Sequence, residues 1–539
     1  MLETDVIVVG AGPVGMTLAL ELAQRGIRTL LVEKRERPLR LPKMERSNPR
    51  SMEIFRRLGL VEKIRAAAYP ADKPMDILVL RSMAQPPLVQ QVYPSVAQAK
   101  VQIAACRDGS LPREPYQLVS QYTLEGLLQT ELLTTPCVQV RLATELQTFH
   151  QDELGVTAEL RSGGATLSVR ARYLVGCDGA GSTVREMLGI AMEGQANLGT
   201  VTNVFFRCDE LLAKSQVPHA RHYLFAGVDA TGGAAGTIVV QDDLKHFGSH
   251  FPILPGPGVD FSAELRKLTG LDIHPEILFV GRWTQNMQVA QAHGQGRVFL
   301  AGDANHIFIP AGGLGMNTGI VDATNLAWKL AATIEGWGGP GLLASYLTER
   351  AAVARRNLRA VAYAIEGVVA WRKLPVPVPA ADAQAHDAAH VAYAAAVEPL
   401  NRRVYEMHGT ELGYCYDSAV ICDEAGEPPP DESYVYRPTT WPGAHLPHVW
   451  LQEDVALYDI LHRGYTLLRL GATPVDTGVL EQALARRGVP FKALEFSDPG
   501  IRAVLQRDLV LVRPDLHVAW RGNVLPESPE AVVAKVTGH

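Results

Sequence analysis

The first residues of the chain alternate short apolar runs with a helical pattern. Residues 5–9 form an apolar run, residues 14–25 follow the spacing of a helix that ends at Gly26, and residues 27–32 are apolar again. Runs this short and this apolar are typical of strands buried on both faces, as in a parallel sheet. The pattern therefore predicts a βαβ unit at the start of the chain.

Beyond this unit the pattern changes twice. Apolar segments at 156–160, 167–169 and 173–175 predict antiparallel strands that feed the core sheet. Residues 198–283 mix β-rich runs with loops, which indicates a sheet-based substrate domain. From 322 to 372 the apolar positions follow helical spacing, so a long helical stretch is expected there.

Composition and charge narrow the classes of protein. With 539 residues, 47% of them apolar and 20% charged, the chain is long enough for two or three domains around large cores. Its 51 basic and 57 acidic side chains give a net charge of -6 without a long basic block, so nucleic acid is not an expected partner. The apolar stretch 6–23 follows two acids and is interrupted by glycines and a proline, so neither a signal segment nor a membrane span is expected.

The cysteines indicate the cellular compartment. Six are scattered along the chain and no two form a CxxC pair. This is typical of free thiols in a reducing environment rather than of a disulfide framework, and it predicts a cytoplasmic protein. No set of metal ligands is predicted.

The turn Gly10-Ala-Gly-Pro-Val-Gly15 carries the first chemical signal, because it follows a strand and opens a helix. In that context Gly10 permits a tight turn, Gly12 permits close approach of a pyrophosphate, and Gly15 permits close packing of the helix. Glu33 ends the second strand at the distance expected of a carboxylate that binds a ribose hydroxyl. The motif predicts a dinucleotide site but does not distinguish FAD from NAD; its structural alternative is an ordinary tight turn.

Three later motifs favour a flavin. They are Cys177-Asp-Gly-Ala-Gly-Ser-Thr-Val-Arg185, Gly296-Arg-Val-Phe-Leu-Ala-Gly-Asp303 and Pro310-Ala-Gly-Gly-Leu-Gly-Met-Asn317. Together they resemble the single-component (class A) flavoprotein aromatic hydroxylases, the p-hydroxybenzoate and phenol hydroxylase family. The resemblance implies bound FAD and NAD(P)H as co-substrate. Beyond Gly10, Gly12, Gly15 and Glu33, the cofactor-binding residues it implies are Lys43, Gln121, Asp178, Asp303, Pro310, Gly313, Gly315, Met316 and Asn317.

The same resemblance implies an α/β fold with three domains. The C-terminal part resembles the phenol and chlorophenol hydroxylase branch, whose last domain is thioredoxin-like; without CxxC it is expected to be structural or to serve association, and a homodimer is expected. The expected boundaries are a Rossmann-like FAD-binding domain at 1–75, 100–190 and 284–372, an interleaved β-rich substrate-binding domain at 76–99 and 191–283, a linker or helical segment at 373–436, and the thioredoxin-like domain at 437–539.

In the family reaction NAD(P)H reduces FAD, and O₂ then adds to the flavin to give a C4a-hydroperoxide that hydroxylates an aromatic ring. A phenol with a pKa near 10 is only about 0.1% ionised at pH 7, so its activation costs about 4 kcal/mol unless a nearby group assists. Glu45 aligns with the position where phenolic hydroxylases often carry an acid or histidine beside the substrate oxygen, so the resemblance makes Glu45 the candidate catalytic base. The alternative for Glu45 is an exposed glutamate between two basic residues. Three weaker candidates for lining the substrate pocket are His222, Tyr223 and Arg282.

Three departures from the family pattern bear on substrate class rather than on reaction class. Lys43 replaces an arginine, Asn305 replaces a small apolar residue, and Ile309 replaces a proline. The rival functions are an epoxidase or a denitrating or dehalogenating monooxygenase, which would use the same oxidant on another carbon. A flavin-binding sensor of redox state or of an aromatic ligand, without turnover, is a third reading.

Overall fold

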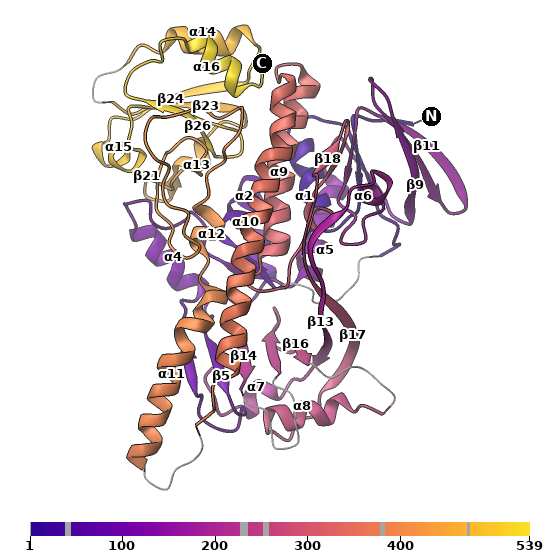
Figure 1. The fold of residues 1–539 in the computed structure, drawn as a ribbon, viewed down its shortest axis with the longest axis vertical. Coiled ribbons are helices and arrows are strands. Elements are labelled where there is room, and N and C mark those ends of the chain that lie inside the picture. The colour runs from indigo at the N-terminus through magenta and orange to yellow at the C-terminus, as the bar shows by residue number, and fades with distance from the viewer. Residues whose placement is uncertain (1, 38–44, 227–235, 252–257, 378–382, 472–474) are drawn as a thin grey trace.

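A computed structural model describes residues 2–37, 45–226, 236–251, 258–377, 383–471 and 475–539. The molecule is elongated, with the C-terminal domain at one end and an eight-stranded sheet at the other (Figure 1). The N-terminal βαβ unit and the long helices α9 (Leu314–Glu335) and α10 (Pro340–Arg372) lie between them. None of the described helices combines the length and apolar character needed to cross a bilayer.

The N-terminal unit lies in a six-stranded sheet ordered β18-β19-β12-β2-β3-β8, in which β2, β3, β8, β12 and β19 run parallel. Helix α1 connects β2 to β3, which confirms the predicted βαβ unit. Two further helices, α5 and α9, pack with α1 on this sheet through apolar side chains. The bounds are β2 Val6–Val9, α1 Pro13–Ala23, β3 Thr29–Val32, α5 Gln121–Thr134, β8 Val138–Arg141, β12 Tyr173–Gly176, α6 Thr183–Met187, β18 Gly294–Gln295 and β19 Val298–Leu300.

A second sheet of four strands, β1-β11-β10-β9, packs beside the first. The segments 156–160 and 167–169 belong to it and are antiparallel, as predicted. The segment 173–175 does not: as β12 it pairs parallel with β2 and β19, since its side chains are buried on both faces. The bounds are β1 Leu2–Glu3, β9 Thr144–Gln151, β10 Val156–Ser162 and β11 Ala165–Ala171.

The β-rich middle of the chain forms an eight-stranded sheet ordered β20-β17-β13-β16-β15-β14-β5-β6. Its longest strands, β13 and β17, rise from this sheet toward the six-stranded one (Figure 1). Strand β5 comes from much earlier in the chain and pairs parallel with β14, so the two sheets are interleaved in sequence. The bounds are β5 Ile77–Leu80, β6 Val89–Gln91, β13 Met192–Arg207, α7 Leu211–Lys214, β14 His222–Phe225, β15 Thr237–Val240, β16 His246–Phe251, α8 Phe261–Thr269, β17 Glu276–Ala290 and β20 His306–Ile307.

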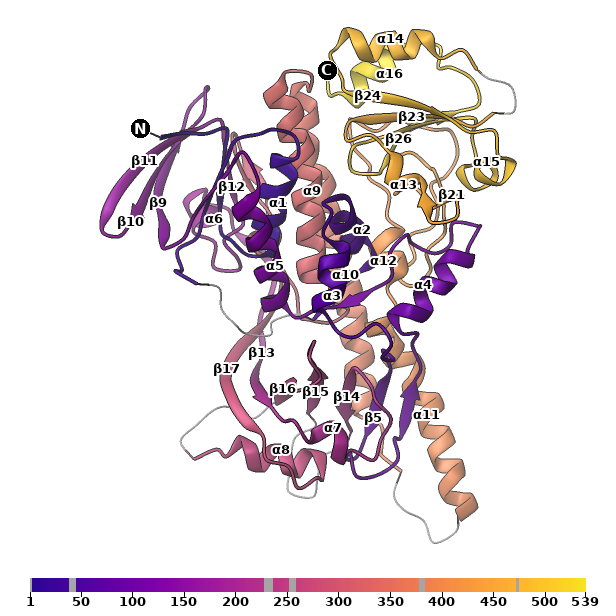
Figure 2. The same cartoon turned by 180° about the vertical axis from the view of Figure 1, so that it is seen from behind.

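Helices surround the junction between these sheets. The expected helical stretch is divided into α9 and α10 at Gly336, whose positive φ ends α9. Helix α11 (Ala383–Tyr405) follows and packs against α10 and β5 (Figure 2). The remaining elements here are β4 Arg46–Ser47, α2 Pro49–Arg57, α3 Val61–Ala67, α4 Val96–Ala105, β7 Gln117–Leu118, the 3-10 turn Gly302–Ala304 and α12 His408–Leu412.

The C-terminal domain contains a four-stranded sheet ordered β24-β23-β25-β26, with β23 and β24 parallel and the other pairs antiparallel. This is the arrangement of a thioredoxin-like core, and the six cysteines of the chain are all free, as expected. The bounds are β21 Trp450–Gln452, β22 Val455–Ala456, α13 Leu457–Ile460, β23 Tyr465–Arg469, α14 Gly478–Arg486, β24 Phe491–Glu495, α15 Pro499–Leu505, β25 Leu509–Val512, β26 Val518–Gly522 and α16 Pro529–Val536.

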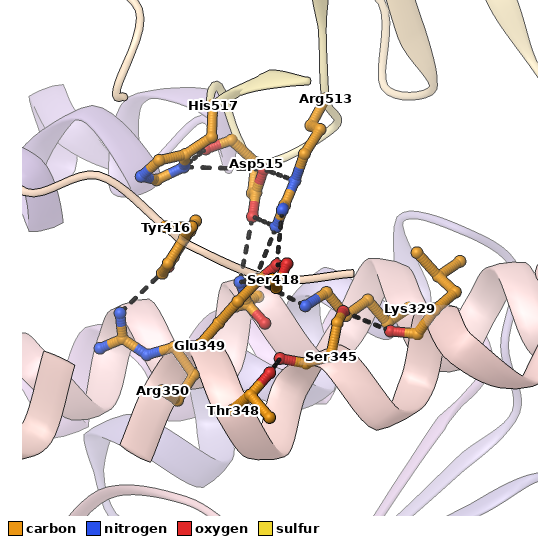
Figure 3. Close-up of polar contacts among 12 residues, drawn as sticks. Lys329, Ser345, Thr348, Glu349, Arg350, Tyr416, Ser418, Arg513, Asp515 and His517 are labelled. Atoms are coloured by element: carbon orange, nitrogen blue, oxygen red, sulfur yellow. Dashed lines mark hydrogen bonds and ion pairs between the residues drawn. The ribbon is translucent and has the colours of Figure 1, made fainter. Parts of the chain in front are cut away.

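A buried charge network joins this domain to α9 and α10 (Figure 3). Arg513 donates to Glu349 at 2.8 and 3.0 Å and to Asp515 at 3.0 and 2.6 Å. Lys329 on α9 donates to Glu349 at 2.7 Å. Two cations thus face two anions, and the network is shielded from solvent. We call these four residues the closed network.

Candidate active site

One cavity of about 560 Å³ connects the Gly10 turn with the eight-stranded sheet. Its size lies within the usual range for ligand sites. At one end it is lined by the N-terminal turn and Glu33, in the middle by the start of α9, and at the other end by residues of the eight-stranded sheet and of α11. The polar and glycine residues of the lining include Gly10, Gly12, Glu33, Glu45, Arg46, Gln121, Asp178, Arg221, His222, Asp303, Gly312, Gly313, Gly315 and Tyr405.

The three glycines of the N-terminal turn have different structural roles. A Cβ at Gly10 would collide with the carbonyl of Cys177, and a Cβ at Gly15 would collide with the carbonyl of Gly10. At Gly12 a Cβ would meet nothing within 4 Å, so the space above it is open to the cavity. Gly10 and Gly15 therefore permit the packing, while Gly12 leaves room for a ligand beside the N-terminus of α1.

Glu33 has its carboxylate fixed at the edge of the same cavity. It accepts hydrogen bonds from the backbone N–H groups of Ala11 at 3.0 Å and Arg35 at 3.0 Å. These contacts hold a carboxylate beside the glycine turn, where it can accept further bonds from a ribose. Gln121, at the start of α5, lines the cavity nearby and donates to Glu125 at 2.6 Å.

Two turns face each other across the middle of the cavity. Asp178 accepts from Ser182 at 2.5 Å and from the backbone of Val184 at 3.1 Å, so it supports the start of α6, whose N-cap is Ser182. Arg185 donates to the carbonyl of Ala304 at 3.1 Å and thereby connects this turn to the one that carries Asp303. Asp303 is exposed to the cavity.

Asp322 of α9 fixes the turn that carries Asp303. Asp322 accepts from the backbone N–H of Gly302 at 3.0 Å and from Arg350 at 2.7 Å, and its carboxylate lies 2.9 Å from His306. Burial opposes the charge on Asp322, but Arg350 and His306 outweigh it and hold its pKa well below the usual range. A buried, ionised Asp322 thus fixes the position of the Gly302 turn.

Helix α9 begins at the cavity. Gly312 and Gly313 have φ of 75° and 65°, a conformation that favours glycine, and they direct the first N–H groups of α9 toward the cavity. Asn317 does not line the cavity: its side chain donates to the carbonyls of Arg46 at 2.9 Å and Gly313 at 2.6 Å. It therefore fixes the helix start, whose positive end can stabilise an anion.

At the far end of the cavity, three side chains form a hydrogen-bonded row. His222 Nε2 lies 3.2 Å from Glu45 Oε1, and His222 Nδ1 lies 2.9 Å from the hydroxyl of Tyr405. The three residues come from a loop, from β14 and from the end of α11. Glu45 is the most exposed of them, with 29% of its side chain accessible against 9% for His222.

The charges in this row follow from its surroundings. Burial opposes ionisation of Glu45, but the hydrogen bond to His222 and the charge of Arg221 outweigh it, and the pKa of Glu45 falls to about 2. Burial and Arg221 lower the pKa of His222 to about 4. At neutral pH Glu45 is therefore ionised and His222 neutral. Neutral His222 then donates from Nε2 to Glu45 and accepts at Nδ1 from Tyr405.

Arg46 lies between this row and the start of α9. Its guanidinium donates to the carbonyl of Tyr405 at 3.2 Å and to Glu411 at 3.3 Å, and it stacks 4.0 Å from the ring of Tyr116. Tyr116 also donates to Glu411. Burial raises the pKa of Glu411 to about 7, so this carboxyl only partly neutralises Arg46 at neutral pH.

The structure separates the predicted substrate-side residues. Glu45 and His222 line the cavity together. Tyr223 does not line the cavity. Its side chain points into the apolar core beside the eight-stranded sheet, where its hydroxyl accepts from the backbone of Ala220 at 3.1 Å. Arg282 is exposed on β17 and is also outside the cavity lining. These positions follow from strand alternation, which points adjacent side chains such as those of His222 and Tyr223 to opposite faces.

On the cofactor side most predicted residues line the cavity, including Pro310, Gly315 and Met316. Gly15 and Asn317 instead pack beneath it. Lys43 lies outside the described residues. Asn305 and Ile309 are buried but are not part of the lining.

Tyr405, Arg221 and Glu411 belong to the site but were not predicted. Tyr405 meets His222 across 183 positions of sequence, and Glu411 meets Arg46 across 365. No local spacing signals such contacts. The only available sign was adjacency, because Arg221 precedes the candidate His222.

Comparison with known proteins agrees with this geometry. Residues 3–361 match the model of an FAD binding domain, and residues 439–539 match that of the C-terminal domain of aromatic-ring hydroxylases. The chain belongs to the family of FAD-dependent aromatic-ring hydroxylases. It is an FAD-dependent monooxygenase of that class.

Individual relatives align over nearly the whole chain. The FAD-dependent monooxygenase apdD of Emericella nidulans is 30% identical, with 99% of this chain and 90% of the relative covered. A 2,4-dichlorophenol 6-monooxygenase of Cupriavidus pinatubonensis is also 30% identical, with 97% and 94% covered. A solved structure of RebC with bound 7-carboxy-K252c is 33% identical with a TM-score of 0.88, covering 100% and 99% of the two chains.

Proposed function

We propose that this monooxygenase hydroxylates a phenolic ring, using O₂ and consuming NAD(P)H. One observation carries the proposal: a single cavity joins the FAD-binding turns to the Glu45, His222 and Tyr405 row. Relatives named as phenol and dichlorophenol monooxygenases support the substrate class. Bound FAD would supply the activation of O₂, and the protein would supply orientation and charge.

The residues present fit FAD. The open space at Gly12 and the fixed carboxylate of Glu33 suit the adenosine and pyrophosphate end. Asp303 and the start of α9 suit the ribityl and pyrimidine end, where the positive end of the helix favours an anionic ring. Asp322 and Asn317 hold these two elements in place from the protein side.

The row of three side chains can move a proton from a substrate hydroxyl. Because Tyr405 donates to His222, the Tyr405 oxygen is left to accept from a substrate O–H in the cavity. A proton passed to Tyr405 displaces its own proton to His222 Nδ1, and the proton on Nε2 passes to Glu45. Glu45 is the most exposed member and returns the proton to water.

The low pKa of Glu45 limits what it does alone. Moving a proton from a phenol with a pKa near 10 to a carboxylate with a pKa of about 2 is strongly uphill. We therefore assign Glu45 the role of fixing the tautomer of His222 rather than that of storing the proton. The phenolate must be stabilised by another group.

The test is isotopic. The purified FAD-loaded protein is supplied with NAD(P)H, ¹⁸O₂ and a panel of phenols, and the products are analysed by mass spectrometry. The proposal expects phenol-stimulated NAD(P)H oxidation and one ¹⁸O atom in a hydroxylated product. Released nitrite or halide would support the rival denitrating or dehalogenating reaction, and NAD(P)H oxidation without labelled product would contradict hydroxylation.

A further inference from the structure

Arg221 is buried in the cavity wall, and its side chain has no hydrogen-bonding partner among the described residues. Only 6% of the residue is accessible, and no described residue accepts a hydrogen bond from its guanidinium or pairs with it as a salt bridge. Its guanidinium carbon lies 5.4 Å from the ring centre of Tyr405, and its charge acts on Glu45 and His222. A buried guanidinium without acceptors destabilises the folded protein. Because Arg221 lines the cavity, we expect a ligand there to accept its hydrogen bonds.

The backbone of Arg221 holds it firmly in this position. Its N–H donates to the carbonyl of Asp76 at 2.9 Å, and its carbonyl accepts from Val240 at 3.0 Å. It is thus fixed between β5 and β15, immediately before β14, on the substrate side of the cavity. The start of α9, which suits the flavin, lies on the cofactor side and is contacted by Arg46 instead.

The charges at the substrate end of the cavity favour binding of an anion. Arg46 and Arg221 are both cationic, Glu45 is ionised, Glu411 is only partly ionised and His222 is neutral. The other histidine near Glu45 is His250, whose pKa is lowered by burial. Among the described residues, the substrate end of the cavity therefore carries net positive charge.

We propose that Arg221 binds an anionic oxygen on the aromatic substrate, either a ring carboxylate or the phenolate formed on binding. This rests on the proposed function, because it names the substrate class of the same site. Arg221 would hold the oxygen through charge-assisted hydrogen bonds, which are about twice as strong as neutral ones. A phenolate held in this way would be favoured over the neutral phenol before any oxidation occurs.

The test uses equilibrium binding to the FAD-loaded protein without NAD(P)H. Salicylate and salicylamide share a ring and a hydroxyl but differ in charge, and their binding is followed by the change in flavin absorption. 4-Nitrophenol is the third probe, because its phenolate has its own visible absorption and reports ionisation directly. We expect salicylate to bind more tightly than salicylamide, or bound 4-nitrophenol to be shifted to its phenolate. The first result assigns a carboxylate to Arg221 and the second a phenolate.

Arg221→Gln is expected to weaken binding of the preferred anion by about 10- to 100-fold, the loss of a hydrogen bond to a charged group. Arg221→Lys should recover part of the affinity because it keeps the charge. Arg207→Gln is the matched control, since Arg207 is an exposed arginine on β13 that pairs with Asp209. The proposal is overturned if Arg221→Gln binds both anions like the unmodified protein, or if neither anion binds or shows the expected preference in the unmodified protein.

Glu45 offers a competing explanation, in which Arg221 only keeps that carboxylate ionised. The two are separated by measuring Arg221→Gln again in a Glu45→Gln background. If Arg221 binds the ligand, its substitution still weakens anion binding there; if it acts through Glu45, the effect disappears and the proposal fails. Binding requires no turnover, so an anion that binds through Arg221 but is never hydroxylated would contradict the proposed function alone.

Discussion

The molecule buries arginines in two regions, which differ in whether the arginine has a carboxylate partner among the described residues. In the closed network Arg513 meets two carboxylates, and Lys329 completes the charge balance (Figure 3). In the cavity, Arg221 is almost equally buried but has no acceptor among the described residues. The first region is complete as folded and stabilises the contact between domains. In the second region the arginine needs a ligand to accept its hydrogen bonds, so the missing acceptor indicates a ligand-binding site.

The largest expected effect is in the closed network. Arg513→Met should lower the free energy of unfolding by about 3–5 kcal/mol, because it leaves Asp515 buried without its cation and leaves Glu349 paired with Lys329 alone. Denaturant unfolding followed by circular dichroism measures this loss. The control is Lys535→Met, which breaks an ion pair with the exposed Asp423 and should cost no more than about 1 kcal/mol. An equal effect of the two substitutions would remove the distinction.

In the cavity the expected loss is of binding rather than of folding. Gly12→Val places a side chain where nothing lies within 4 Å, and the backbone there has a φ of -76° that valine can adopt. We expect the stability of the apoprotein to be retained and FAD affinity to fall about 10- to 100-fold through overpacking of the bound cofactor. Titration of the apoprotein with FAD, read by flavin fluorescence, measures it. Undiminished affinity would mean that the pyrophosphate does not approach Gly12.

The pH dependence of stability tests the neutral state of His222. Its pKa is about 4 in the folded protein and about 6.5 in the unfolded chain, so the unfolded chain binds the extra proton first as the pH falls. Stability is therefore lost below pH 6.5, by about 2 kcal/mol between pH 7 and pH 5 from this residue. His222→Gln should reduce the loss measured by denaturant unfolding at the two pH values. Glu45, with its low pKa, contributes a loss only at lower pH, as the pH falls below about 4.5 toward 2.

The smallest expected effect has the opposite sign to the first. Arg221→Met removes a buried cation that has no acceptor among the described residues, so the free energy of unfolding should change by less than about 1 kcal/mol or should rise. Thermal and denaturant unfolding of the apoprotein measure it. A loss of unfolding free energy as large as that of Arg513→Met would show that Arg221 has a structural partner. The two regions would then no longer differ.

The sequence predicted the cofactor end of the cavity better than the substrate end. The Gly10 turn and Glu33 were predictable because their positions in the cavity wall depend on spacing within one βαβ unit. Arg221, Tyr405 and Glu411 were not, because they meet through three separate elements. The segment 173–175 was assigned to antiparallel strands because its short apolar run is compatible with either kind of sheet. Its parallel pairing depends on the neighbours β2 and β19.

Asp322 and Glu349 show a further limit of prediction from sequence. Asp322 has apolar neighbours in the sequence whereas Glu349 lies between Thr348 and Arg350, and each could have been an exposed residue by pattern alone. In the fold one holds the Gly302 turn and the other receives Arg513 from the C-terminal domain. Their roles depend on long-range partners that a helical pattern does not contain.

Tyr405 and Glu411 have a consequence for building hybrids between members of the family. Tyr405 lines the cavity and Glu411 contacts the lining residue Arg46, and both come from a segment that lies after the matched FAD-binding region and before the C-terminal domain. A chimera joined near residue 372 would combine the substrate sheet of one parent with the Tyr405 wall of another. Exchange of substrate preference therefore requires the crossover to fall after Leu412, so that the cavity is inherited as one piece.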